Sequence, residues 1–177
     1  MERIDPRILL GNMRLVNPLD FQVTDVDFKV AIRALSRLPR YSGQTTKPYY
    51  VAEHEVKLYR KVPKHLRRAV LLHDTSEGFG LLDLPNPIKR AIDGYSALEK
   101  AMLRVIFLSV DEPWEHMEEL EQYDRRICAD EMLQVFDEPW IAKLWEPLGG
   151  VKVDFWGQRR CETELTKLFI KEGLLHV

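Results

Sequence analysis

The chain has 177 residues, of which 45% are hydrophobic and 31% charged, so it can bury a core and does not resemble a disordered or fibrous protein. Its 26 Lys and Arg residues nearly balance its 28 Asp and Glu residues, and the formal net charge is -2. This balance argues against a dedicated nucleic-acid-binding protein, because such domains are usually basic. We expect a single domain covering residues 1–177, with no stable nucleic-acid partner.

The charges are distributed unevenly along the chain. Residues 29–68 contain eleven basic residues but only two acids, Glu53 and Glu55, whereas residues 111–138 contain eleven acids but only two basic residues. An asymmetry of this size suggests an anionic partner near the first half of the chain. Two solvated helix faces of opposite charge are the alternative that composition alone leaves open.

The two cysteines, Cys128 and Cys161, are too few for a disulfide framework or a zinc ribbon. Residues 1–15 mix charge with leucine and lack the apolar centre of a signal peptide. No stretch approaches the length of a membrane span. We therefore expect a soluble cytoplasmic protein with reduced thiols and no membrane partner.

Apolar residues recur at helical spacing through most of the chain, which predicts an all-α protein. The first thirty residues read as turns and short extended pieces, with a break at Asn17-Pro18. The predicted helices cover residues 25–38 with Asp25 as N-cap, 51–60, 63–78, 88–93, 97–108, 115–136 and 157–171. Residues 40–50 and 81–87 are predicted loops, and 151–155 is a weak strand candidate. The pattern favours a compact bundle of six to eight helices.

His73 and Asp74 adjoin inside an apolar run, where ionisable side chains are costly unless they are paired, hydrogen-bonded or bound to metal. Glu77 follows four residues after His73, on the same helix face. His54 lies in the preceding predicted helix, and a tight turn between the two helices would bring the two imidazoles together. A capped helix end is the simpler interpretation of the His-Asp pair taken alone.

The predicted helix over 115–136 carries two carboxylates, Asp124 and Glu131, in its apolar stripe. A carboxylate there indicates a metal site, a buried salt bridge to an arginine of the first half, or a partly exposed seam. Together His54, His73, Asp74 and Asp124 form a ligand set without thiolate. Such a set suits Mn²⁺, Co²⁺, Fe²⁺, Mg²⁺ or Zn²⁺.

The order His…His-Asp…Asp resembles the HD phosphohydrolase superfamily, which is all-α and metal-dependent. Over roughly residues 16–135 the chain is similar to small nucleotide-acting members of bacteria and phages. The segments that carry this likeness are Ala34-Leu35-Ser36-Arg37, Arg40-Tyr41-Ser42-Gly43, Tyr50-Val51-Ala52-Glu53-His54, Leu72-His73-Asp74-Thr75-Ser76-Glu77 and Asp83-Leu84-Pro85-Asn86-Pro87-Ile88-Lys89. Residues 136–177 would then be a C-terminal helical extension. Two subgroups fit, bacterial 5′-deoxynucleotidases and phage deoxynucleoside triphosphohydrolases that act on dATP.

The resemblance implies a role for each motif residue. The implied ligands of one or more divalent metal ions are His54, His73, Asp74 and Asp124. Glu77 would orient or deprotonate the attacking water, and Asp83 would lie near the leaving group, although it stands one step further from Glu77 than relatives typically show. Arg40 and Tyr41 would contact the substrate. Lys89, just after the proline-containing loop, is a further candidate for an anionic substrate.

The function implied is metal-dependent hydrolysis of a small-molecule deoxynucleotide, with dATP converted to deoxyadenosine and triphosphate. The alternative within the family is a 5′-deoxynucleotidase that releases phosphate from dNMPs. The alternative of another class is a non-catalytic nucleotide-binding module. Relatives assemble as dimers or larger rings, so we expect a homo-oligomer, in the host cytoplasm if the chain is phage-encoded.

Overall fold

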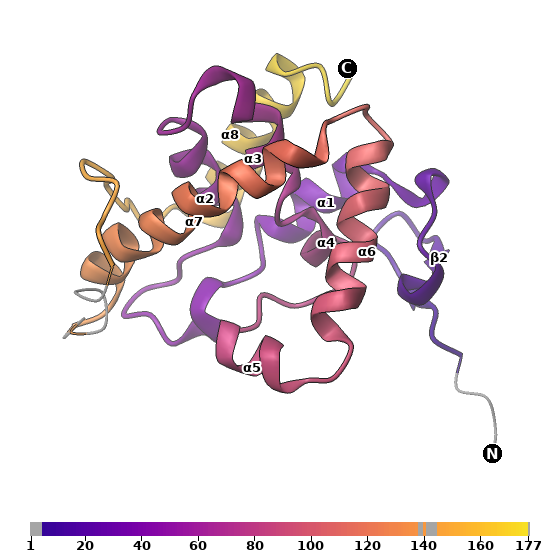
Figure 1. Ribbon diagram of the computed structural model, residues 1–177, viewed down its shortest axis with the longest axis horizontal. Coiled ribbons are helices and arrows are strands. Elements are labelled where there is room, and N and C mark those ends of the chain that lie inside the picture. Colours follow the sequence, from indigo (N-terminus) through magenta and orange to yellow (C-terminus); the bar gives the residue numbers. More distant parts are fainter. Residues whose placement is uncertain (1–4, 138–139, 141–144, 177) are drawn as a thin grey trace.

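Short helices joined by loops make up most of the protein, whose computed structural model describes residues 5–137, 140 and 145–176 (Figure 1). The predicted all-α class is confirmed, since the described residues contain one small antiparallel hairpin besides helices and loops. The hairpin pairs β1 (Ile8–Leu9) with β2 (Leu15–Val16). The α-helices are α1 (Phe28–Leu35), α2 (Val51–Tyr59), α3 (Arg67–Leu72), α4 (Thr75–Gly78), α5 (Asn86–Ala91), α6 (Tyr95–Leu108), α7 (Trp114–Val135) and α8 (Gln158–Lys171).

Helix α1 begins later than its sequence predicts. Asp27 is the N-cap, and its side chain accepts the backbone N–H of Lys29 at 3.0 Å. Asp25 belongs to the preceding 3₁₀ turn, where it accepts the N–H of Gln22 at 3.0 Å. The prediction of Asp25 as the cap was therefore wrong, because both aspartates carry the acceptor that a helix N-terminus requires.

The predicted helix over residues 63–78 is divided into a 3₁₀ turn and the two helices α3 and α4. His73 is the C-cap of α3 and Asp74 is the N-cap of α4, so the His-Asp pair lies at the break between the two helices. Gly78 allows α4 to lie close against α1. A Cβ at this position would stand 2.8 Å from the Cα of Ala31, so α4 can approach α1 this closely only with glycine.

Two smaller differences concern the loops. Helix α5 begins at Asn86 instead of residue 88, because Pro87 occupies the first turn, where a missing N–H costs nothing. Residues 151–155 form no strand. The C-terminal backbone is instead anchored by Glu53, whose fully buried carboxylate accepts the N–H groups of Asp154 and Trp156, each at 2.7 Å.

Helix α2 is the centre of the core, and each of its residues is buried. It packs against α1, α3, α7 and α8, and Figure 1 shows α7 crossing this group while α6 stands beside it. The buried residues of α8, Cys161, Leu165 and Phe169, belong to the same hydrophobic cluster as those of α1 and α2. The C-terminal segment is therefore part of the core that holds the motif-bearing helices.

Within the described ranges, no helix combines the length and apolarity needed to cross a membrane. The tryptophans of the last third do not share one environment. Trp156 is buried, whereas the side chains of Trp140 and Trp145 are exposed.

Candidate metal centre

The four predicted ligands lie close together. His54 of α2 and His73 at the end of α3 place their Nε2 atoms 3.4 Å apart. Asp124 of α7 contributes Oδ1, which lies 3.1 Å from Nε2 of His54 and 3.8 Å from Nε2 of His73. Asp74 contributes Oδ2, which lies 3.3 Å from Nε2 of His73 and 3.9 Å from Nε2 of His54.

The other nitrogen of each imidazole is held by an acceptor. Nδ1 of His54 donates to Oε1 of Glu131 at 2.6 Å, and Nδ1 of His73 donates to the carbonyl of Val70 at 2.7 Å. A carboxylate and a carbonyl only accept hydrogen bonds, so Nδ1 carries the proton in both rings and Nε2 faces the centre. This arrangement is typical of histidines that bind a metal.

The centre strongly favours positive charge. Burial and the charge of Arg40 disfavour the imidazolium of His54, but the carboxylates of Glu131 and Asp124 outweigh them and raise its pKa to about 9. Burial likewise disfavours the imidazolium of His73, and Asp74 and Asp124 outweigh it and raise that pKa to about 10. In the absence of another cation, the site would therefore take up protons.

The donor set fits a divalent metal ion. Two imidazole nitrogens and two carboxylates suit Mn²⁺, Co²⁺, Fe²⁺, Zn²⁺ or Mg²⁺. Oδ2 of Asp74 is buried and has no hydrogen-bond partner among the described residues. A cation at the point of convergence would satisfy this atom, so these residues could hold a metal ion.

Glu131 forms hydrogen bonds with several side chains around the centre. It is fully buried, and besides His54 it accepts the hydroxyl of Tyr49 at 2.7 Å and that of Tyr41 at 2.9 Å. Burial raises its pKa, but the charges of His54 and Arg40 and these hydrogen bonds outweigh burial and lower the pKa to about 2. Oε2 of Glu131 lies 3.4 Å from Nε of Arg40. This contact is the buried salt bridge to an arginine of the first half that the sequence left open as an alternative.

Arg40 and Tyr41 occupy a 3₁₀ turn (Arg40–Gly43) beside the centre. Tyr41 has a φ of 53°, a left-handed conformation that few non-glycine residues adopt. Arg40 is buried, with its guanidinium 3.7 Å from Oδ2 of Asp74. The structure thus places Arg40 against a ligand, whereas the hydroxyl of Tyr41 is engaged by Glu131.

Glu77 of α4 is buried within the same region. Burial and the charges of Asp74 and Asp83 raise its pKa well above the usual range, which makes this carboxylate a stronger base than an ordinary glutamate. Lys89 of α5 lies 3.6 Å from Oε1 of Glu77 and 2.6 Å from Oε1 of Glu99. Asp83 is half-buried in the loop before α5, where its charge acts on Glu77, and it makes no hydrogen bond or ion pair with the part of the chain that is described.

Two groups at the centre were not predicted from the sequence, the hydroxyl of Tyr49 and the carboxylate of Glu55. The sequence around Tyr49 indicates only an aromatic residue of the core. Nothing in the sequence pattern indicates that its hydroxyl contacts Glu131. Glu55 is fully buried beside His54, and burial raises its pKa well above the usual range. The sequence does single out Glu55, because Glu53 and Glu55 are the two acids of the basic segment 29–68.

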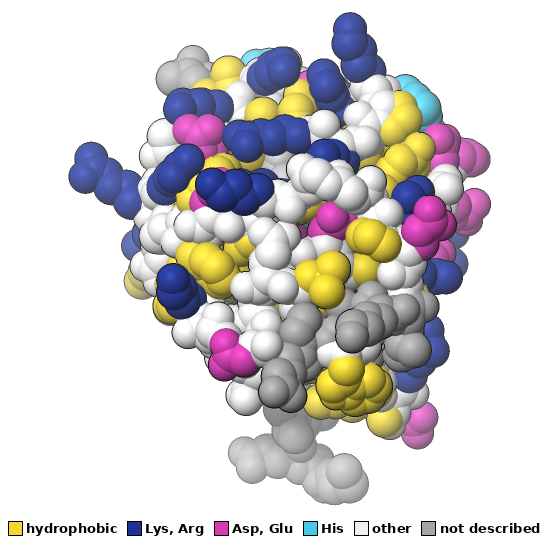
Figure 2. Space-filling model, turned by 90° about the vertical axis from the view of Figure 1, so that its left-hand side faces the viewer, with side chains coloured by type: hydrophobic (Ala, Val, Ile, Leu, Met, Phe, Trp, Pro, Cys, Tyr) yellow, Lys and Arg dark blue, Asp and Glu magenta, His cyan; other side chains and the backbone are white. Residues whose placement is uncertain are grey.

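The basic segment itself is dispersed over the molecule. Among its described contacts, Arg37 pairs with Glu162 at 3.0 Å, Lys57 with Asp154 at 2.5 Å and Arg68 with Glu112 at 2.9 Å, all away from the four ligands. Figure 2 shows Lys and Arg side chains gathered over the upper part of one face. At the centre, the segment contributes Arg40.

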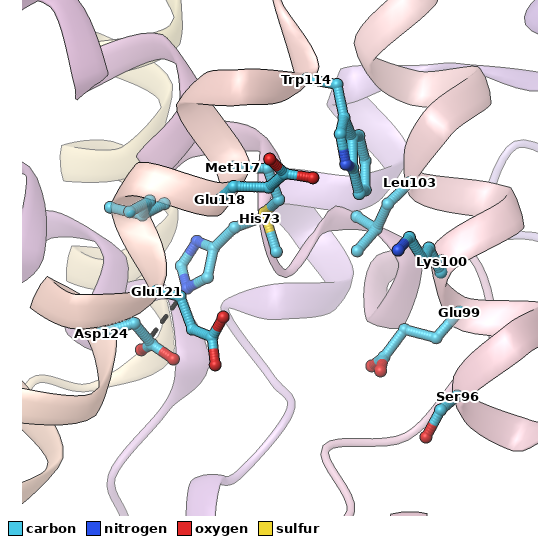
Figure 3. Close-up of a pocket in the computed structure, with 11 residues that line it drawn as sticks. His73, Ser96, Glu99, Lys100, Leu103, Trp114, Met117, Glu118, Glu121 and Asp124 are labelled. Atoms are coloured by element: carbon cyan, nitrogen blue, oxygen red, sulfur yellow. Dashed lines mark ion pairs between the residues drawn. The ribbon is translucent and has the colours of Figure 1, made fainter.

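A cavity of about 240 Å³ opens between α6 and α7 beside two of the ligands, His73 and Asp124 (Figure 3). Its remaining lining is part apolar and part charged, and consists of Leu103, Trp114, Met117, Leu120, Ser96, Glu99, Lys100, Glu118 and Glu121. Ligand pockets usually measure about 300–1,000 Å³, so this cavity is slightly smaller than a typical one.

No family model matches the chain. The chain is similar to the Escherichia coli (strain K12) protein named "Uncharacterized protein YfdR", with 30% identity over 91 residues. The match covers 51% of this chain and 48% of that protein, so the chain spans about half the length of the curated relative it matches.

Proposed function

We propose that the protein is a metal-dependent phosphohydrolase that acts on deoxynucleotides. The observation that carries this proposal is the convergence of His54, His73, Asp74 and Asp124 beside the buried carboxyl of Glu77. A divalent ion held by these four side chains would acidify a water molecule and polarise a phosphoryl oxygen.

Glu77 is the residue we assign to orient the attacking water and accept its proton. Its carboxyl is buried, Oε2 has no hydrogen-bond partner within the described chain, and its pKa is raised by burial and by Asp74 and Asp83. A carboxylate whose pKa is raised is a stronger base than an ordinary one and is suited to accept and return a proton during a reaction.

Arg40 and Lys89 supply the positive charge that phosphoryl transfer requires. Arg40 borders the centre through Asp74, at 3.7 Å, and Lys89 borders it through Glu77, at 3.6 Å. Tyr41 then acts mainly by holding Glu131 in place, since that is where its hydroxyl donates.

The cavity between α6 and α7 suits the uncharged part of the substrate. Its acidic residues, Glu99, Glu118 and Glu121, would repel a phosphate chain, whereas its apolar wall can pack against a sugar or a base. The substrate would therefore lie with its phosphates toward Arg40 and Lys89 and its nucleoside toward the cavity. Carboxylates at the rim can also accept hydrogen bonds from an amino group on the base.

Product analysis tests the proposal and separates its two forms. We would incubate the protein with each dNTP and dNMP in the presence of Mn²⁺, Co²⁺, Mg²⁺ or Zn²⁺ and identify the products by anion-exchange chromatography. Triphosphate from dATP is the expected result, and orthophosphate from dNMPs would indicate the 5′-deoxynucleotidase. Nucleotide binding without turnover would indicate the non-catalytic module.

Asp74→Ala is the matching variant, because it removes a side chain within 4 Å of both imidazoles. Hydrolysis that persists undiminished in this variant would overturn the proposal. Glu115→Gln, an exposed substitution on α7, is the control and should leave the activity unchanged.

A further inference from the structure

Residues 82–94, between α4 and α6, form a segment in which no residue is buried. The segment contains α5, which Figure 1 shows at the edge of the molecule, apart from the helices around α2. Gly80 and Gly94 stand near its two ends, with φ angles of 103° and 81° that residues other than glycine rarely adopt. Packing against the core therefore contributes little to holding this segment in place.

Two side chains of α6 hold the segment instead. The hydroxyl of Tyr95, the first residue of α6, donates to the carbonyl of Leu82 at 2.8 Å and accepts the N–H of the same residue at 3.1 Å. One turn further along α6, Oε1 of Glu99 accepts from Lys89 at 2.6 Å. Among the described residues, these are the hydrogen bonds that join residues 82–94 to side chains elsewhere in the chain. The hydroxyl of Tyr95 is thus the contact that fixes the backbone where the segment begins.

Asp83 is the residue whose place depends most directly on this contact. It follows Leu82 in the chain, and its own side chain makes no hydrogen bond or ion pair with the described residues, so its backbone alone determines where it lies. Its charge nevertheless acts on two groups of the proposed site, Glu77 and Arg40. Such an interaction weakens with distance, so a displaced backbone at Leu82 would reduce it.

We propose that Tyr95 is a positioning residue, whose hydroxyl holds the backbone at Leu82 so that Asp83 stays beside Glu77 during the reaction. The negative charge of Asp83 makes it more favourable for Glu77 to accept a proton from the attacking water. A misplacement of about 1 Å can cost about 10²-fold in rate, so a hydroxyl that touches no reacting atom can still affect turnover. The inference rests on the proposed function, because Glu77 receives its role there.

Tyr95→Phe keeps the ring and removes both hydrogen bonds to Leu82. Amide hydrogen exchange measures the structural effect without any hydrolysis. We expect the amides of Leu82 and Asp83 to exchange at least tenfold faster than in the wild type, whereas the amides of α2 exchange at the wild-type rate. Tyr59→Phe is the matched control, because it also removes a hydrogen-bonded hydroxyl, one that donates to Glu172 and not to the segment. It should leave the exchange of residues 82–94 unchanged.

The kinetic effect is measured with the nucleotide that the wild type hydrolyses. We expect kcat of Tyr95→Phe to fall at least tenfold, with KM and Mn²⁺ affinity within about threefold of the wild type, whereas Tyr59→Phe keeps its kcat. Asp83→Asn should lower kcat by a similar factor. Tyr95→Phe added to Asp83→Asn should then cost less than a further threefold, because Tyr95 acts through Asp83 and the two losses do not multiply.

The outcomes separate this inference from the proposed function. A wild-type kcat in Tyr95→Phe or in Asp83→Asn, unchanged exchange at Leu82, or a double variant in which the two single losses multiply overturns the positioning role alone. A wild-type protein that hydrolyses no nucleotide overturns both. Tyr95 is half-buried and Phe keeps its ring, so the variant should fold, which its thermal midpoint in EDTA checks. If it does not fold, Asp83→Asn and the exchange rate at Leu82 relative to α2 in the wild type, expected to be at least tenfold faster, decide the inference.

Discussion

Nδ1 of His54 lies 2.6 Å from Oε1 of Glu131, and both side chains are completely buried. The contact fixes the orientation of the imidazole, so that Nε2 points toward His73 and Asp124. It also joins α2 to α7, two helices far apart in the sequence. The hydroxyls of Tyr41 and Tyr49 hold the carboxylate in the same position.

Glu131→Gln should therefore weaken metal binding without removing a ligand. The amide oxygen can still accept from His54, but the negative charge that makes the imidazole a better ligand is lost. Substitutions of such supporting residues typically cost about 10–100-fold in metal affinity. Calorimetric titration with Mn²⁺ measures the effect, and Tyr41→Phe, which keeps the carboxylate, should show a smaller one. Equal affinities for Glu131→Gln and the wild type would show that this contact does not tune the centre.

The stability of the metal-free protein should fall as the pH rises above neutrality. The folded-state pKa values of His54 and His73, about 9 and about 10, lie above the ordinary value of 6.5. Their protonation therefore stabilises the folded state fully below pH 6.5, and this contribution is lost as the pH rises toward 9 and 10.

Thermal midpoints measured in EDTA between pH 6.5 and pH 9 check this prediction. Mn²⁺ should raise the midpoint more at the higher pH, because the ion and the protons compete for the same nitrogens. His73→Gln should flatten the pH dependence in EDTA. A wild-type midpoint that rises with pH in EDTA would contradict the assignment.

The sequence predicts α2 and α7 closely, since each has a long apolar pattern bounded by loops. The break at His73 and Asp74 was not predicted, because His73 continues the apolar face of the helix before it. That break depends on the close approach of Gly78 to Ala31, a contact between residues far apart in the chain.

The residues of the candidate site also divide into those that the sequence indicates and those that it does not. His73, Asp74, Asp124 and Glu131 are visible in the sequence because ionisable residues interrupt apolar patterns. Tyr49 is not, because its ring belongs in any core and the role of its hydroxyl is decided by a carboxylate on another helix.

Glu77→Gln should separate catalysis from metal binding. The amide keeps the size of the side chain but cannot accept a proton, and proton transfer by a positioned group contributes about 10²–10⁴-fold to rate. We expect kcat for the preferred nucleotide to fall by this factor, whereas Mn²⁺ affinity stays as in the wild type. The control is Glu115→Gln. An unchanged kcat would show that Glu77 has no role in the mechanism. Loss of Mn²⁺ binding in this variant would show that Glu77 is a metal ligand.

Glu53→Ala should destabilise the fold whether or not a metal ion is bound. Glu53 is fully buried and accepts the backbone N–H groups of Asp154 and Trp156, so the substitution leaves one partly buried and one buried donor without an acceptor. Each such donor costs about 1–3 kcal/mol, and about 1 kcal/mol lowers the thermal midpoint by about 2–4 °C in a chain of this size. We expect a decrease of at least about 4 °C, measured both in EDTA and in Mn²⁺. Glu162→Ala breaks an exposed ion pair with Arg37 and is the control, with an expected cost of about 0–1 kcal/mol. Equal midpoints for the two variants would show that the carboxylate of Glu53 does not anchor the C-terminal segment to α2.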